Sequence, residues 1–99
     1  MVTVVTRVRI KEGREAEWDE VFSQRVEAAR RQPGFVFVQL CHPEGSRGDR
    51  VVVGTWETRE NWEAWHHDDA FLETRKQLEE AGDEQQSSEW WEVVVEARA

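Results

Sequence analysis

The sequence contains no tyrosine, one cysteine, two prolines and no long hydrophobic run. A single cysteine excludes an internal disulfide framework and is typical of a reducing compartment. Apolar runs reach only three or four residues, far short of the roughly 20 that a membrane-spanning helix needs. No charged and apolar leader opens the sequence. We therefore expect a single cytoplasmic globular domain over residues 1–99, with no membrane partner.

Basic side chains are also few, with 13 Lys and Arg against 21 Asp and Glu, which gives a formal net charge of -8. Most of the acidic excess lies in residues 57–92. A negatively charged surface repels phosphate groups, so nucleic acid and anionic lipid are not expected partners. The acidic stretch is compatible both with a solvated surface and with a contact to another protein.

Hydrophobic periodicity alternates along the chain between the two-residue period of strands and the 3.6-residue period of helices. Polar, turn-rich loops are expected at His42–Asp49 and Ala81–Ser88. In chain order, the expected elements are a strand Val2–Ile10, a helix Arg14–Gln32, a strand Phe35–Cys41, a strand Arg50–Trp56, a short helix capped by Thr58, a helix capped by Asp68 or Asp69 that continues through Leu78, and a strand Trp90–Ala97.

This order, β-α-β-β-α-α-β, predicts an α+β fold of the ferredoxin-like split βαβ type, with a four-stranded antiparallel sheet and its helices on one face. The second and third expected strands are nevertheless apolar on both faces, and the first carries Val5 on the face opposite Val4 and Val8. In the second strand, alternation places Phe35 and Phe37 on one face and Val36, Val38 and Leu40 on the other. Because the helices can cover only one face, we expect a homodimer in which two sheets pack together. The alternative is a monomer with an exposed apolar sheet.

Three segments resemble the antibiotic biosynthesis monooxygenase family: Gln32-Pro33-Gly34-Phe35, VVVGTWETRENWEAW over Val51–Trp65, and DDAF over Asp68–Phe71. The resemblance covers nearly the whole chain and implies a dimeric α/β barrel. It is less specific for activity, because relatives include cofactor-free monooxygenases, haem-degrading enzymes and members with no demonstrated reaction.

Six tryptophans in so short a chain indicate a large aromatic cluster. Trp62 and Trp65 share one helix face, and Trp56 ends the preceding strand, while Trp18 and Phe22 come from the first helix. We expect these rings to line a pocket for a flat apolar molecule. The alternative is that they only fill the core.

Two arginines fall at or near apolar helix stripes, where a charge can favour the ionised form of a bound phenol or enol. Arg25 is one candidate for substrate binding, and Arg75 is the other. The resemblance favours Arg75 as the catalytic anion-binding residue, since cofactor-free members place an arginine on this helix and tryptophans at positions matching Trp56 and Trp62. Each arginine has the alternative of reaching solvent or pairing with a nearby Glu.

His42, at the end of the second expected strand, is the candidate general base, with a solvated loop histidine as the alternative. Cys41 is expected to be a buried structural residue, because strand neighbours point to opposite faces and His42 cannot activate it. His66-His67-Asp68-Asp69 does not have the spacing of a zinc site, so no metal is expected.

The haem-degrading branch of the family fits this sequence poorly. Its members carry an Asn in the first strand, where this chain has Thr6, and an axial His on the last helix, where Thr74 and Arg75 stand. Without that imidazole the iron has no evident ligand, so no cofactor is expected.

These observations support three hypotheses. The first is a cofactor-independent monooxygenase that acts on a small phenolic, quinol-like or polyketide-like aromatic. The second is a non-catalytic dimeric protein that binds a hydrophobic metabolite or associates with a larger enzyme. The third is a fully packed core with no cavity.

Overall fold

The computed structural model describes residues 1–45, 48–82 and 87–99. Its elements follow the predicted order β-α-β-β-α-α-β. They are β1 (Val2–Arg9), α1 (Glu15–Ala29), β2 (Phe35–Cys41), β3 (Asp49–Trp56), α2 (Arg59–Trp65), α3 (Asp69–Ala81) and β4 (Ser87–Glu92). Residues 46–47 and 83–86, which belong to the two predicted loops, lie outside the described residues.

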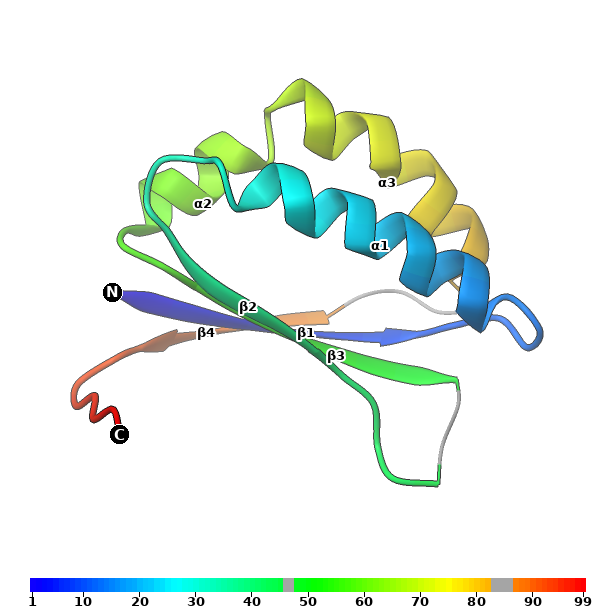
Figure 1. Cartoon of the computed structure of the whole chain (residues 1–99), viewed down its shortest axis with the longest axis horizontal. Helices are drawn as coiled ribbons and strands as arrows, with labels where there is room; N and C mark the ends of the chain where they lie inside the picture. Colours follow the sequence, from blue (N-terminus) through cyan, green and yellow to red (C-terminus); the bar gives the residue numbers. More distant parts are fainter. Residues whose placement is uncertain (46–47, 83–86) are drawn as a thin grey trace.

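The four strands form one sheet in the order β2-β3-β1-β4, and every neighbouring pair is antiparallel. All three helices lie on the same side of this sheet (Figure 1). The α+β ferredoxin-like fold is therefore confirmed. In the part of the chain that the structure describes, no helix is long and apolar enough to cross a membrane.

Helix starts follow the predicted capping residues. The Thr58 side chain accepts a hydrogen bond from the Asn61 amide at 3.1 Å, and the Asp68 side chain accepts one from the Ala70 amide at 2.9 Å. Each bond satisfies an N–H group that the first helical turn cannot pair internally. The two caps define α2 and α3 as separate helices.

The last strand is the largest correction to the predicted boundaries. The prediction was Trp90–Ala97, but β4 begins at Ser87 and ends at Glu92. Glu92 lies opposite Val2, the first residue of β1, and the Val93 amide donates to the carbonyl oxygen of Met1. β1 begins at Val2, so the valine-rich tail has no residue of β1 opposite it and does not extend the strand despite its β-propensity.

Strand β2 contains an irregularity that changes the predicted faces. Phe35 pairs with Trp56, while Phe37 already pairs with Thr55, the next residue along β3. An extra residue in one strand breaks the two-residue alternation. The predicted pairing of Phe35 with Phe37 on one face is therefore wrong, because Phe35 lines the helix side with Val38.

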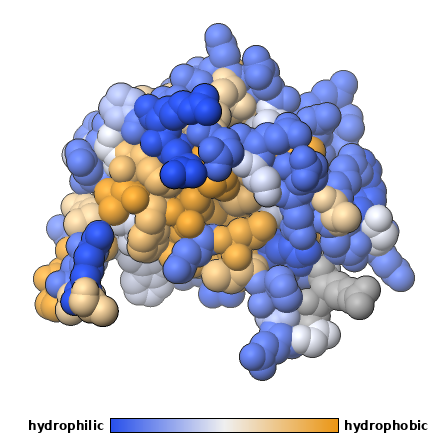
Figure 2. All heavy atoms as spheres, viewed as in Figure 1, coloured by the Kyte–Doolittle hydropathy of each residue, from blue (hydrophilic) through white to orange (hydrophobic). Residues whose placement is uncertain are grey.

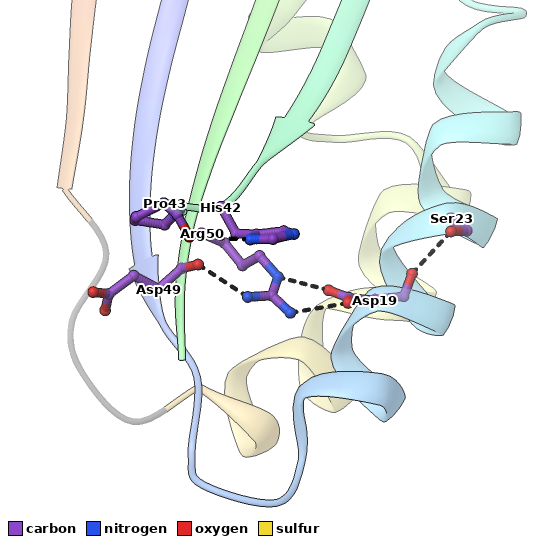
Figure 3. Close-up of polar contacts among 6 residues, drawn as sticks. All are labelled: Asp19, Ser23, His42, Pro43, Asp49 and Arg50. Atoms are coloured by element: carbon purple, nitrogen blue, oxygen red, sulfur yellow. Dashed lines mark hydrogen bonds and ion pairs between the residues drawn. The ribbon is translucent and has the colours of Figure 1, made fainter. Parts of the chain in front are cut away.

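An ion pair between a buried arginine and a partly exposed aspartate joins α1 to β3. The Arg50 side chain is 6% exposed, and its Nε and Nη2 donate to the two carboxylate oxygens of Asp19 at 2.8 and 2.9 Å (Figure 3). The hydrogen bonds to Asp19 raise the pKa of Arg50. This bidentate contact fixes the first half of α1 over the sheet.

The sheet face away from the helices carries an apolar patch among polar residues. The strand register places Val5, Val53 and Phe37 on this outer face together with Trp91. Phe37 is 40% exposed and Trp91 is 56% exposed. Cys41 ends β2 and is exposed, which contradicts the prediction of a buried cysteine. Its position in the last residue pair of an edge strand explains the exposure, because nothing in the described chain packs over it.

Candidate functional site

A cavity of about 130 Å³ lies between the helices and the sheet. Figure 2 shows hydrophobic residues gathered between these two layers. An apolar cavity of about 150 Å³ binds benzene, so this cavity is close to the size that a single aromatic ring requires. Its walls are formed by Val4, Thr6, Val8, Trp18, Phe22, Arg25, Val26, Ala29, Phe35, Val38, Val52, Gly54, Trp56, Trp62, Trp65, His66, Phe71, Leu78 and Ser88.

The predicted aromatic residues all reach this cavity, but most of their surface is used in packing. Trp18 is 1% exposed, and its ring stacks on Phe22 with 5.0 Å between centroids and an interplanar angle of 7°. Trp56 and Trp65 are each 4% exposed. These rings therefore serve both as core and as cavity wall, which combines two interpretations that the sequence presented as alternatives.

The cavity wall at α2 is built from rings on two elements. Trp62 contacts Trp90 of β4 edge-on, with 4.5 Å between ring centroids. The Arg59 guanidinium lies 4.3 Å from the centroid of the Trp90 ring and covers it from outside. Cation–π contact and edge-to-face packing both favour this arrangement. The α2 wall of the cavity is thereby linked to the edge strand β4.

Arg25 is the cation of the cavity. Its Nε donates to Thr74 Oγ1 at 2.8 Å, and its Nη2 donates to the Phe71 carbonyl oxygen at 2.9 Å. No described Asp or Glu side chain forms an ion pair with it. The helix spacing explains the position, because Arg25 follows Phe22 by three residues and precedes Ala29 by four, on the buried stripe of α1.

The surroundings of Arg25 destabilise its charge without removing it. Burial lowers the pKa of Arg25 to about 10, and the positive charge of Arg75 contributes to the lowering. The side chain therefore remains protonated at neutral pH. A half-buried cation held by uncharged acceptors retains attraction for an anion that enters the cavity.

His66 is a cavity residue that the sequence analysis did not assign to the site. It is the C-cap of α2, and its Nδ1 lies 2.8 Å from the Trp62 carbonyl oxygen. A carbonyl oxygen only accepts, so Nδ1 carries the hydrogen and Nε2 keeps its lone pair. The i, i+4 spacing from Trp62 was the signal that could have placed His66 on the same face.

Burial lowers the pKa of His66 below 6.5, and nearby positive charges, Arg25 first, lower it further. The hydrogen bond to the Trp62 carbonyl acts in the opposite direction. The imidazole is consequently neutral at pH 7 and can accept a proton at Nε2. Its ring also lies 4.2 Å from that of Phe71, and the Arg25 guanidinium covers the same ring, so the imidazole and the guanidinium share Phe71 as a neighbour.

The two residues predicted as catalytic lie outside the cavity. Arg75 is 60% exposed and pairs with Glu79 of the same helix at 2.9 Å. It follows Thr74 on α3 and is rotated by about 100° from that buried position. His42 is exposed after β2, where its Nδ1 lies 3.2 Å from the Pro43 carbonyl oxygen (Figure 3). Arg25 and His66 lie in the cavity wall, where the prediction had expected Arg75 and His42.

Comparison with known proteins places this arrangement in a family. A family model described as antibiotic biosynthesis monooxygenase matches residues 1–77, which include α1, the sheet core and most of the cavity wall. The chain belongs to the antibiotic biosynthesis monooxygenase family. The resemblance read from the sequence motifs is thus confirmed.

Solved structures of antibiotic biosynthesis monooxygenase family members share the fold. The chain is similar to SnoaB, a cofactor-independent oxygenase from Streptomyces nogalater, with a TM-score of 0.86 and 22% identity over 96% of this chain and 94% of SnoaB. It is also similar to Rv0793 from Mycobacterium tuberculosis, with a TM-score of 0.86 and 15% identity over 98% of each chain. Identities this low demonstrate a common fold and not a common reaction.

A curated relative has a described activity of a different kind. The heme oxygenase (mycobilin-producing) of Mycobacterium tuberculosis strain H37Rv is 30% identical over 64 residues, which are 65% of this chain and 61% of that protein. The chain therefore spans less than two thirds of the length of the curated relatives that it matches.

The position expected for a haem ligand from the family resemblance does not carry a histidine. Thr74, one of the two residues at that expected position, is buried and its hydroxyl accepts from Arg25. Among the described residues, no group of three or more His, Cys, Asp and Glu side chains could hold a metal ion.

Proposed function

We propose that the chain is a cofactor-independent monooxygenase that oxidises a small phenolic or quinol-like aromatic with molecular oxygen. One observation carries the proposal: a charged Arg25 and a neutral His66 both contact the Phe71 ring, and all three residues line an aromatic cavity. Family membership and the fold shared with a cofactor-independent oxygenase support the same reaction class.

The reaction begins with proton transfer. The ring hydroxyl of the substrate gives its proton to Nε2 of His66, and the oxyanion that remains is stabilised by Arg25. Because the cavity is mostly apolar, the charge of Arg25 is screened less than it would be in water. The substrate is thereby converted into an electron-rich anion, the form that reacts with oxygen.

The anion then reacts with O2 at a ring carbon that bears hydrogen and lies ortho or para to the oxyanion. A C–O bond forms, and the imidazolium of His66 returns its proton to the outer peroxide oxygen. Loss of the proton on that carbon and cleavage of the O–O bond give a quinone and water. One oxygen atom of O2 enters the product and the other leaves in water, so the substrate itself supplies all the electrons. The tryptophan walls restrict water around the anion.

The homodimer remains part of this proposal. Members of this family are generally dimeric. The outer sheet face carries exposed Phe37 and Trp91 beside Val5 and Val53, and a second copy of the chain packed sheet to sheet would cover them.

Oxygen uptake tests the proposed reaction. A panel of phenols, naphthols and quinols is incubated with the protein under 18O2, and the quinone products are analysed by mass spectrometry. We expect uptake above the autoxidation of protein-free controls and one 18O atom in each product. No uptake above background with any panel member would contradict the proposal. Ligand binding without product would instead identify a binding or accessory protein for a hydrophobic metabolite.

A further inference from the structure

Two hydroxyl groups, one of them on the exposed Ser88, lie in the sheet wall of the cavity. Thr6 of β1 and Ser88 of β4 both line the cavity, and their hydroxyl oxygens are 3.1 Å apart. The two residues are directly opposite each other in the antiparallel register of β1 and β4. Arg25 and His66 belong to α1 and α2, so the cavity has polar groups on its sheet wall as well as on its helical wall.

A hydroxyl pair differs chemically from the cation on the other wall. One hydroxyl donates to its neighbour, and the neighbour's own hydrogen stays free to donate elsewhere. Each oxygen also retains a lone pair, and the hydroxyl hydrogens rotate to suit the ligand. The pair can therefore donate to a carbonyl oxygen or accept from a hydroxyl group, whereas Arg25 can only donate.

We propose that Thr6 and Ser88 form a specificity subsite that hydrogen-bonds a second oxygen of the substrate, on the ring edge opposite the oxygen held by Arg25. This inference rests on the proposed function and deepens it, since such a subsite selects aromatics with oxygens on two opposite edges of the ring. The hydroxyl pair accepts from the ring hydroxyl of a quinol and donates to the carbonyl oxygen of the hydroxyquinone that its monooxygenation gives. The same subsite thus serves the substrate before oxidation and the product after it.

A purely structural role predicts different behaviour. Cross-strand Thr–Ser pairs stabilise many sheets by hydrogen bonding alone. Such a role would affect thermal stability and leave the choice between ligands unchanged. The chain provides a matched control, because Thr3 of the same strand forms an equivalent bond of 2.8 Å with Thr55 on the opposite face of the sheet.

The test compares two ring compounds of similar shape, hydroquinone and 4-methylphenol, which differ in having a hydroxyl or a methyl group opposite the phenol oxygen. Dissociation constants are measured by NMR titration in oxygen-free buffer, so the result does not depend on turnover. One net hydrogen bond of about 0.5–1.5 kcal/mol corresponds to a preference of roughly two- to tenfold for hydroquinone in the wild-type protein. We expect the preference to fall to about onefold in Thr6→Val/Ser88→Ala and to persist in Thr3→Val.

The outcomes separate this subsite from the proposed reaction. Equal binding of both compounds by the wild-type protein, an unchanged preference in Thr6→Val/Ser88→Ala, or no binding of either compound would each overturn the subsite. If the double variant is not folded by circular dichroism, Ser88→Ala and the hydroxyl-retaining Thr6→Ser replace it, and only Ser88→Ala should reduce the preference. A preserved subsite without oxygen uptake would disprove the monooxygenase and leave this recognition intact.

Discussion

The guanidinium carbon of Arg25 lies 3.8 Å from the centroid of the Phe71 ring, while its Nη2 donates to the carbonyl oxygen of the same residue. One residue of α3 therefore holds the arginine of α1 through both its side chain and its backbone. The arrangement orients the cation without neutralising it, and it explains why Arg25 can act on a ligand.

Substitution of Arg25 should change the acidity of a bound phenol. We expect 4-nitrophenol to have a lower pKa when bound than in solution, by about 1–3 units, because a nearby cation favours the anion. Arg25→Ala should abolish most of this shift. The measurement is a spectrophotometric titration of the bound ligand.

Arg75→Ala is the matched comparison, since it removes an arginine that pairs with Glu79 outside the cavity. In Arg75→Ala, we expect the lowering of the pKa of bound 4-nitrophenol to be largely retained. A larger loss in Arg75→Ala than in Arg25→Ala would return the anion-binding role to Arg75, as the sequence had indicated.

His66 should make the protein less stable in mild acid. Its pKa in the folded chain is below 6.5, so the unfolded chain binds its proton more readily. This contribution to stability is complete above pH 6.5 and is lost as the pH falls toward the folded-state value. Urea unfolding of the wild-type protein and His66→Gln between pH 5 and 8 should show a weaker pH dependence in the variant.

The neutral imidazole should also determine the acid limb of activity. We expect the acid limb of kcat/KM to have a midpoint below 6.5, and NMR titration of the His66 ring to give the same value. The exposed His42 is the comparison. Loss of the acid limb in His42→Ala and its retention in His66→Gln would exclude His66 as the base.

Gly34 should be one of the least replaceable glycines. It has a φ of +81°, and an added Cβ would overlap the Asn61 side chain. Gly13 has a similar φ of +85° but open space around it, so Gly13→Ala isolates the backbone penalty of roughly 1–2 kcal/mol. We expect Gly34→Ala to lower the free energy of unfolding by clearly more than Gly13→Ala in chemical denaturation. Equal losses would show that Asn61 moves aside freely.

A charge on the outer sheet face should dissociate the proposed dimer. Val53→Glu places a carboxylate in the apolar patch, and burying it unpaired is unfavourable. Sedimentation should show a dimer for the wild-type protein and a monomer or aggregate for Val53→Glu. Leu72, which is 45% exposed on α3, provides a control in Leu72→Glu that should remain dimeric. A monomeric wild-type protein would refute the interface.

Local signals in the sequence were sufficient to predict the fold. The caps at Thr58 and Asp68 act within three residues, and the apolar stripe of α1 is periodic, so both could be recognised without tertiary information. The end of β4 could not be recognised in this way, because it depends on where β1, far away in sequence, begins. The irregularity near Phe35 could not be predicted either, because one extra residue in a strand does not change the amino-acid composition in a recognisable way.

The candidate site was only partly predictable for a similar reason. Aromatic residues at helical spacing indicated the cavity wall, and Arg25 could be placed on the buried stripe of α1. Choosing between Arg25 and Arg75 required knowledge of which face α3 turns toward the sheet. Thr74 and Arg75 are consecutive residues, yet Thr74 is buried and Arg75 is exposed. His66 acquires its role through a bond to a backbone carbonyl, which side-chain identity does not reveal.

The charge of Arg25, which forms no ion pair with a described carboxylate, has a practical consequence for work on this protein. Small anions such as phosphate, acetate and chloride are attracted to the same guanidinium and would compete with an acidic ligand. Apparent affinities should therefore fall with the concentration and type of buffer anion, so ligand screens belong in low-salt solutions of bulky zwitterionic buffers.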